Sequence, residues 1–122
     1  MKLNRYIAIL LLTLLGISSC RAEVAEDDVP VFIKNKIKEI KEGEVWNPPA
    51  KVFRYKYNGS AVYFFPARCC DVQSELYDEN FTKICSPNGG YSGRGDGKCL
   101  DFLQHRTEEE LIWEDTRKPN KN

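Results

Sequence analysis

Residues 51–65 read Lys-Val-Phe-Arg-Tyr-Lys-Tyr-Asn-Gly-Ser-Ala-Val-Tyr-Phe-Phe, and this stretch decides the fold. Two runs rich in aromatic residues flank Asn58-Gly59, the dipeptide that favours a two-residue hairpin turn. Such a turn predicts two sets of cross-strand pairs: Tyr57 with Ser60, Tyr55 with Val62 and Phe53 with Phe64 on one face, and Val52 with Phe65, Arg54 with Tyr63 and Lys56 with Ala61 on the other. We expect the first, more apolar face to pack against a helix.

That helix is predicted before the hairpin, because apolar residues recur at helical spacing at Val29, Ile33, Ile37 and Ile40. Asp28 or Val29 can cap it, Pro30 suits its first turn, and Gly43 ends it. Its lysines are interpreted as a solvated side rather than a membrane-binding surface.

The rest of the domain is predicted from shorter patterns. Two short strands are expected over residues 75–78 and 82–85, around a turn at residues 79–80. The apolar cluster 111–113 is either a strand or part of a helix capped by Thr107. The predicted fold class is therefore α+β, with one N-terminal helix packed on a small antiparallel sheet and a disulfide-braced, glycine-rich loop.

The first nineteen residues have the character of a signal peptide. Lys2 and Arg5 precede a short apolar stretch, residues 7–15, which is followed by small residues. The apolar stretch is shorter than the roughly 20 residues that a membrane-spanning helix needs. We therefore expect export and removal of residues 1–19.

The residues at the expected cleavage point, Ile17-Ser18-Ser19-Cys20, resemble the lipobox of bacterial lipoproteins. The resemblance implies that Cys20 receives a diacylglycerol, becomes the new N-terminus and is acylated there. Two or three acyl chains hold a protein on a membrane far more firmly than one does. Arg21, in place of an aspartate, favours the outer membrane of a Gram-negative cell. Plain secretion with a free Cys20 is the alternative.

These boundaries divide the chain into four parts: a signal peptide (1–19), a lipidated cysteine with an acidic tether (20–28), a globular domain (29–115) and a disordered tail (116–122). The acidic tether resembles surface-export signals of one group of Gram-negative bacteria, and a plain linker is the alternative. Removing the signal peptide leaves a charge of about two negative units, so no nucleic-acid partner is expected.

Four cysteines lie beyond the tether, at Cys69, Cys70, Cys85 and Cys99, and predict two disulfides in a small exported domain. A bond between Cys69 and Cys70 would be strained, because adjacent residues of an extended chain point to opposite faces. We therefore expect one of them to pair with Cys85 and the other with Cys99, in either order. A zinc site is the alternative, although the spacing contains no C-x-x-C pair.

The candidate ligand loop lies just before Cys99 and contains Gly89, Gly90, Gly93, Gly95, Asp96 and Gly97. Such glycine density indicates positive φ angles or a close approach to the backbone. A tightly turned, disulfide-braced loop is the simplest interpretation. Calcium is the alternative ligand, because carboxylates at Asp96 and Asp101, with Asp71 and Asp78, could supply oxygen atoms.

No catalytic set of residues is recognisable, and the single histidine, His105, lies in a polar stretch without a predicted partner. We therefore expect neither enzymatic activity nor a cofactor. Most aromatic side chains are expected in the core. Tyr63, Phe65 and Tyr91 are the candidates for contact with a partner.

Six segments together resemble a family of small lipoproteins classed as a domain of unknown function. They are Tyr-Lys-Tyr-Asn-Gly-Ser-Ala-Val-Tyr (55–63), Cys-Cys-Asp (69–71), Leu-Tyr-Asp (76–78), Ile-Cys-Ser-Pro-Asn-Gly-Gly (84–90), Gly-Arg-Gly-Asp-Gly-Lys-Cys (93–99) and Asp-Phe (101–102). The resemblance covers about residues 30–115, and Leu100 stands where family members often carry proline. It implies one exported, cysteine-bonded domain and no particular activity.

Together these features predict a membrane-anchored binding module in the cell envelope or on the surface, with a protein or glycan partner. Protease inhibition through the loop 86–98 is the second hypothesis, since a rigid exposed loop suits preorganised inhibition. A calcium-dependent or hydrolytic site at Asp96 and Asp101 is the third.

Overall fold

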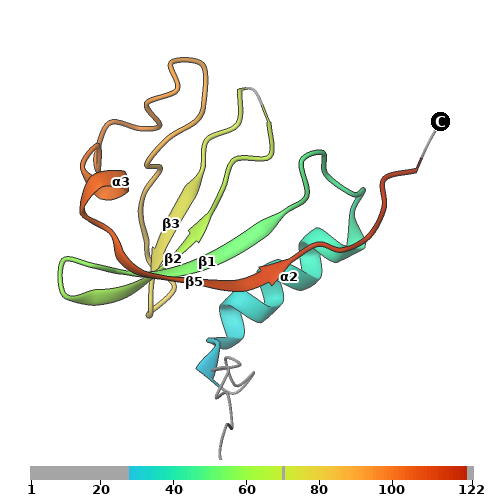
Figure 1. The fold of residues 1–122 in the computed structure, drawn as a ribbon, viewed down its shortest axis with the longest axis horizontal. Helices are drawn as coiled ribbons and strands as arrows, with labels where there is room; N and C mark the ends of the chain where they lie inside the picture. Colours follow the sequence, from blue (N-terminus) through green and yellow to red (C-terminus); the bar gives the residue numbers. More distant parts are fainter. Residues whose placement is uncertain (1–27, 70, 121–122) are drawn as a thin grey trace, which may run out of the picture.

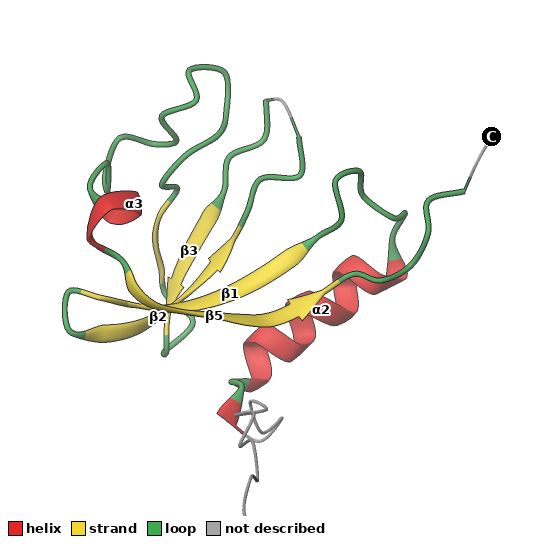
Figure 2. Cartoon of the chain, viewed as in Figure 1, coloured by secondary structure: helices red, strands yellow, loops and turns green. Residues whose placement is uncertain are grey.

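The computed structural model describes residues 28–69 and 71–120, which form one helix-covered sheet (Figures 1 and 2). The elements, in chain order, are α2 (Val31–Glu42), β1 (Lys51–Tyr57), β2 (Ser60–Phe65), β3 (Glu75–Asp78), β4 (Lys83–Cys85), α3 (Phe102–His105) and β5 (Thr107–Glu114). The signal peptide, Cys20, most of the tether and Cys70 lie outside the described residues.

The hairpin of β1 and β2 has the predicted register. The pairs Phe53 with Phe64, Tyr55 with Val62 and Tyr57 with Ser60 are confirmed, as are Arg54 with Tyr63 and Lys56 with Ala61 on the other face. Asn58 and Gly59 both have positive φ angles, of 50° and 80°. This is the backbone conformation that a two-residue hairpin turn requires.

The sheet has five antiparallel strands in the order β4-β3-β2-β1-β5. Strands β3 and β4 form the predicted second hairpin. The apolar cluster 111–113 belongs to strand β5, so the strand alternative is correct and the helix alternative is wrong. Strand β5 pairs with β1 at the edge of the sheet. The predicted α+β class is therefore confirmed.

Helix α2 begins at Val31, so neither Asp28 nor Val29 is its N-cap, contrary to the prediction. Pro30 is its N-cap, and Gly43 follows its last residue as predicted. A proline suits the start of a helix because the first amide groups of a helix have no intrahelical acceptor. Ile33 is fully buried, and Val29, Ile37 and Ile40 pack around it on the sheet.

The predicted packing face of the hairpin is wrong. Helix α2 packs on the face that carries Val52, Tyr63 and Phe65. The opposite face, with Tyr55, Tyr57 and Phe64, belongs to a second core. The error arose because both faces of the hairpin are apolar, so alternation along the strands does not show which one the helix covers.

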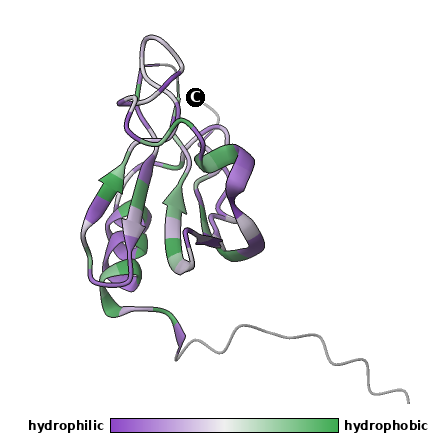
Figure 3. Cartoon of the chain, turned by 90° about the vertical axis from the view of Figure 1, so that its left-hand side faces the viewer, coloured by the Kyte–Doolittle hydropathy of each residue, from purple (hydrophilic) through white to green (hydrophobic). Residues whose placement is uncertain are grey.

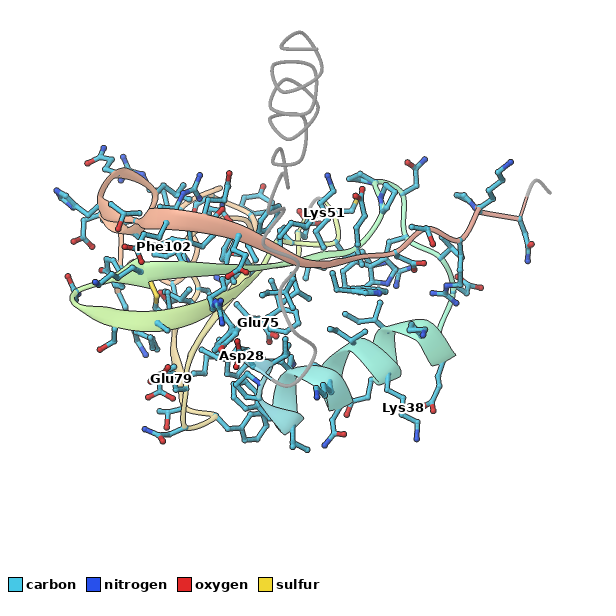
Figure 4. All side chains as sticks on the ribbon, turned by 60° about the horizontal axis from the view of Figure 1, so that its bottom comes forward. Asp28, Lys38, Lys51, Glu75, Glu79 and Phe102 are labelled. Carbon is cyan, nitrogen blue, oxygen red and sulfur yellow. A yellow bond between two sulfur atoms is a disulfide. The ribbon has the colours of Figure 1, made fainter. Side chains whose placement is uncertain are left out.

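The second core forms around Phe102, which is fully buried at the start of α3. The ring of Phe102 lies 5.6 Å from that of Tyr55, 5.3 Å from Tyr57 and 5.3 Å from Phe64, centroid to centroid. Figure 4 shows Phe102 and α2 on opposite sides of the sheet. The chain beyond the glycine-rich loop therefore covers the face that was predicted for the helix.

The disulfide that the structure describes joins Cys85 to Cys99, with their Cα atoms 6.2 Å apart. The prediction that Cys85 and Cys99 each pair with one of the two neighbouring cysteines is therefore wrong. The glycine-rich loop folds back on itself and returns Cys99 to the end of β4, which chain order alone does not indicate. Cys69 is disulfide-bonded as well.

The C-terminal segment crosses back to the helix. Arg117 lies in the segment for which disorder was predicted, and its guanidinium donates hydrogen bonds to the carbonyl oxygens of Ile40, Lys41 and Gly43, over 2.8–3.2 Å. It also pairs with the carboxylate of Asp115, which is 3% exposed. Across the described part of the chain, no helix has the length and apolar character needed to cross a membrane.

Candidate ligand-binding cleft

Three loops lie along the side of the domain opposite to the start of α2. They are residues 43–50, 66–74 and 86–101, at the top of Figure 1, and the same arrangement is visible from the side in Figure 3. Each loop leaves the end of a helix or strand, so the rigid sheet sets its position. Loops held in this way are where binding residues most often occur.

A cleft of about 260 Å³ lies between α2, the adjoining ends of β2 and β3, and two of these loops. Apolar and polar side chains both line it: Lys36, Glu39, Ile40, Trp46, Phe65, Pro66, Arg68, Val72, Gln73 and Glu75. Mixed lining of this kind, an apolar wall with a few polar groups, is typical of small ligand sites.

Lys36 forms the inner polar group of the cleft. Its Nζ lies 3.1 Å from the carboxylate of Glu75 and 5.0 Å and 5.3 Å from the ring centres of Tyr77 and Phe65. Burial lowers the pKa of Lys36, but the hydrogen bond and charge of Glu75 outweigh burial, so the pKa is raised. Lys36 therefore stays protonated, and Figure 4 places its partner Glu75 between the sheet and α2.

Trp46 and Arg68 form the outer rim. The guanidinium of Arg68 lies 5.6 Å from the centre of the Trp46 ring, within the range of a cation–π interaction. The Nη2 atom of Arg68 also lies 4.0 Å from the carboxylate of Glu44, and the Arg68 side chain is 48% exposed. The guanidinium therefore keeps donors that a ligand can use.

A second, smaller cleft of about 180 Å³ adjoins the first. Its lining is mostly proline and alanine, with Trp46 and Pro66 shared between the two clefts: Trp46, Pro48, Pro49, Ala50, Lys51, Pro66 and Ala67. Trp46 and Pro66 therefore connect the two clefts, and the charged lining residues Lys36, Glu39, Arg68 and Glu75 belong to the larger one. An extended, amphipathic ligand would contact both clefts.

The glycine-rich loop lies beside this surface and is braced by backbone hydrogen bonds, both within the loop and to its neighbour. Gly90 donates a hydrogen bond to the carbonyl of Val72, and Gly95 donates one to Gly89. All five glycines have positive φ angles, as predicted. The loop presents Tyr91, which is 99% exposed, so Tyr91 remains a candidate for partner contact. Protease inhibition through this loop stays a prediction.

Tyr63 and Phe65, the two other aromatic candidates, are 2% and 6% exposed. Helix α2 covers the hairpin face that carries them, so neither side chain is available to a partner on an exposed hairpin face. Phe65 still contributes to the floor of the cleft. Tyr63 packs edge-on against Phe32 of the helix.

Asp96 and Asp101, the main candidates for calcium ligands, form hydrogen bonds with different partners. Asp96 accepts a hydrogen bond from the amide of Lys98, and Asp101 accepts one from the hydroxyl of Tyr57 at 2.8 Å. These bonds are the leading cause of a lowered pKa for each carboxylate. His105 lies 3.4 Å from Asp101. Within residues 28–69 and 71–120, no three histidine, cysteine or acidic residues are grouped as metal ligands would be.

Sequence reasoning missed the main residues of the cleft. Lys36 was interpreted as one of several solvated lysines, and Arg68 and Gln73 were not singled out. Trp46 was not singled out either, because most aromatic residues were expected in the core. A tryptophan beside two prolines, outside any predicted strand or helix, was a signal that could have pointed to a surface role.

Comparison with known proteins gives a family and little more. The model of the family described as Domain of unknown function (DUF6970) matches residues 38–115. No curated protein matches the chain, and neither does any solved structure. The matched residues run from the second half of α2 to the residue after β5, and so include every residue that lines the cleft except Lys36. The chain therefore belongs to this family of unknown function.

Proposed function

We propose that the protein is an exported lipoprotein, anchored through Cys20, whose domain binds an amphipathic ligand of the cell envelope in the cleft beside Trp46. Its ligand is a protein segment or a glycan. The module has no enzymatic role in this proposal, and the outer membrane is its expected location.

The anchor is supported by residues 1–20, which combine a basic start, a short apolar stretch and the lipobox-like end Ile17-Ser18-Ser19-Cys20. The Cys85–Cys99 disulfide supports export independently. Such bonds persist in oxidising compartments outside the cytosol and are rare inside it.

The observation that carries the binding role is the cleft itself. An apolar wall is bordered by planar, exposed groups on Arg68 and Gln73, which can form several hydrogen bonds each. The charged lining residues balance: two are basic (Lys36 and Arg68) and two are acidic (Glu39 and Glu75). This balance favours a ligand without a strong net charge.

The anchor is tested by the intact mass of the native protein taken from the membrane fraction. We expect a chain that begins at Cys20 and carries the mass of two or three acyl chains. A chain that begins at another residue, or one that carries no acyl group, would disprove the anchor and leave the binding role to be judged separately.

The binding role is tested by photo-crosslinking in intact cells. A photoreactive residue at Val72, which is 51% exposed and lines the cleft, should capture a discrete envelope component. The same residue at Leu103, 41% exposed on α3 and away from the cleft, is the matched control. Combining Trp46→Ala with Arg68→Ala should abolish the product at Val72. Identical products from both positions, or a product that survives the double substitution, would refute the proposed cleft.

A further inference from the structure

A second exposed surface lies at the opposite end of the domain. It consists of Val31, Phe32 and Phe81, and we call it the basal patch. Val31 is 71% exposed and Phe81 is 57% exposed. From its chemistry and its position we propose that the basal patch rests on the lipid bilayer that holds the anchor. This inference depends on the proposed lipidation of Cys20.

Phe81 is held outward rather than left loose. It lies in the turn between β3 and β4 with a φ angle of 67°, a conformation that is rare for a bulky residue. Its ring lies 5.0 Å from that of Phe32 and is stacked on Tyr77, 5.9 Å away with an interplanar angle of 9°. The aromatic residue is thus fixed at the surface by packing beneath it.

The turn itself is braced by Asp78. One carboxylate oxygen of Asp78 accepts hydrogen bonds of 2.9 Å from the amides of Asn80 and Thr82. The amide of Asp78 donates to the carbonyl of Thr82 over 3.0 Å. A rigid turn that exposes an apolar ring costs stability in water, and contact with an apolar phase removes that cost.

The position of the patch identifies its partner. The turn of residues 79–82 and the start of α2 lie at the same end of the domain, as the labels Glu79 and Asp28 show in Figure 4. Asp28 is the eighth residue after Cys20, and a chain of that length spans at most about 28 Å. An acylated Cys20 therefore keeps the start of α2 within that distance of the bilayer.

Exposed lysines lie beside the patch on α2. Val31, Lys34 and Lys38 are exposed and lie three and four residues apart, so they share one side of α2. Aromatic rings with lysines beside them are common where proteins meet the interface of a membrane, because the rings enter it and the ammonium groups reach the headgroups. The exposed acids Asp28 and Glu79 lie at the same end of the domain, so the lysines give the patch no net positive charge, and its apolar side chains carry the proposal.

The experiment places a tryptophan reporter at each end of the lipidated, full-length mature protein. Trp46→Phe and Trp113→Phe remove the two natural tryptophans. Phe81→Trp and Val31→Trp report on the basal patch, and Tyr91→Trp reports on the far end as the control. Each protein is reconstituted into phosphatidylcholine–phosphatidylglycerol vesicles, with and without bromine on the acyl chains.

Brominated lipid should quench the fluorescence at positions 81 and 31 by at least about twofold and leave position 91 unchanged. The two basal reporters are independent, so one that fails to fold does not prevent the test. Protein that floats with the vesicles but shows equal quenching at both ends overturns the basal patch and leaves the anchor intact. Protein that floats without any quenching also overturns the basal patch and leaves the anchor intact. So does floating protein whose fluorescence shifts to the blue as its concentration rises, because that shift indicates contact with a second copy of the chain. Protein that does not float with the vesicles overturns the patch and the anchor together.

Discussion

At the scale of the residue, Gly95 shows why the loop 86–98 needs so many glycines. A Cβ atom at this position would lie 1.7 Å from the carbonyl oxygen of Ser86, far inside any real contact. The φ angle of Gly95 is also positive, at 63°. Gly97 has a similar φ angle of 76° but nothing within 4 Å of its would-be Cβ. The two positions therefore separate the cost of conformation from the cost of crowding.

Gly97→Ala should lower the free energy of unfolding by about 1 kcal/mol, the cost of a left-handed conformation for an L residue. Gly95→Ala should lower it by more than about 3 kcal/mol, because the backbone around Ser86 has to move as well. Urea unfolding followed by circular dichroism measures both. Equal losses for the two variants would show that crowding at Ser86 does not matter.

At the scale of the element, the C-terminus of helix α2 is stabilised by Arg117, which lies 74 positions after Gly43 in the chain. The guanidinium of Arg117 meets the last carbonyl oxygens of the helix, where a cation is favoured by the helix dipole. The same group binds both carboxylate oxygens of Asp115. The hydrogen bond from Arg117 is the main cause of the lowered pKa of Asp115, which burial opposes.

Arg117→Ala should therefore lower the melting temperature by several degrees at pH 7, while Lys118→Ala, the matched control, should leave it unchanged. The pKa of Asp115 is lower in the folded protein than in the unfolded chain. Its contribution is thus present above the unfolded value of about 4 and is lost as the pH falls through the folded pKa. The difference in melting temperature between wild type and Arg117→Ala should therefore become smaller in that acidic range.

Thermal unfolding at a series of pH values from neutral to strongly acidic tests this prediction. Part of this difference in melting temperature should persist in acid, because the hydrogen bonds from Arg117 to the carbonyls of Ile40, Lys41 and Gly43 do not depend on the charge of Asp115. A difference that widens toward low pH would contradict the assigned pairing of Asp115 with Arg117.

At the scale of the whole molecule, the Cys85–Cys99 disulfide and Phe102 act together. The bond closes a loop across a sequence separation of 14 residues and returns the chain to β4. Three residues later Phe102 enters the core formed by Tyr55, Tyr57 and Phe64. The disulfide therefore limits the conformations from which this second core has to form.

Replacing both cysteines with alanine should cost about 3 kcal/mol of stability, the value expected for a loop of this length. Amide hydrogen exchange should also quicken across residues 86–101, while the β1–β2 hairpin stays protected. Urea unfolding measures the loss of stability, and mass spectrometry measures the amide hydrogen exchange. Unchanged exchange in the loop would show that its backbone hydrogen bonds suffice without the disulfide.

The candidate cleft shows how far prediction from sequence reached at this scale. Its residues come from α2, from β2 and β3, from the loop around Trp46 and from the loop around Arg68, so no single pattern contains them. Lys36 has the same sequence character as its exposed neighbours Lys34 and Lys38. It differs only because Glu75 of β3 and the ring of Tyr77 lie opposite it.

The sequence by itself determined the hairpin register, helix α2 and the glycine loop, because each depends on residues close together in the chain. Asn58-Gly59 specifies its turn, apolar spacing specifies the helix, and glycine permits positive φ angles. Only the tertiary structure decided which hairpin face α2 covers and that Cys85 pairs with Cys99. Both hairpin faces are apolar, and both outcomes depend on where the chain returns after residue 86, a choice made by long-range packing around Phe102.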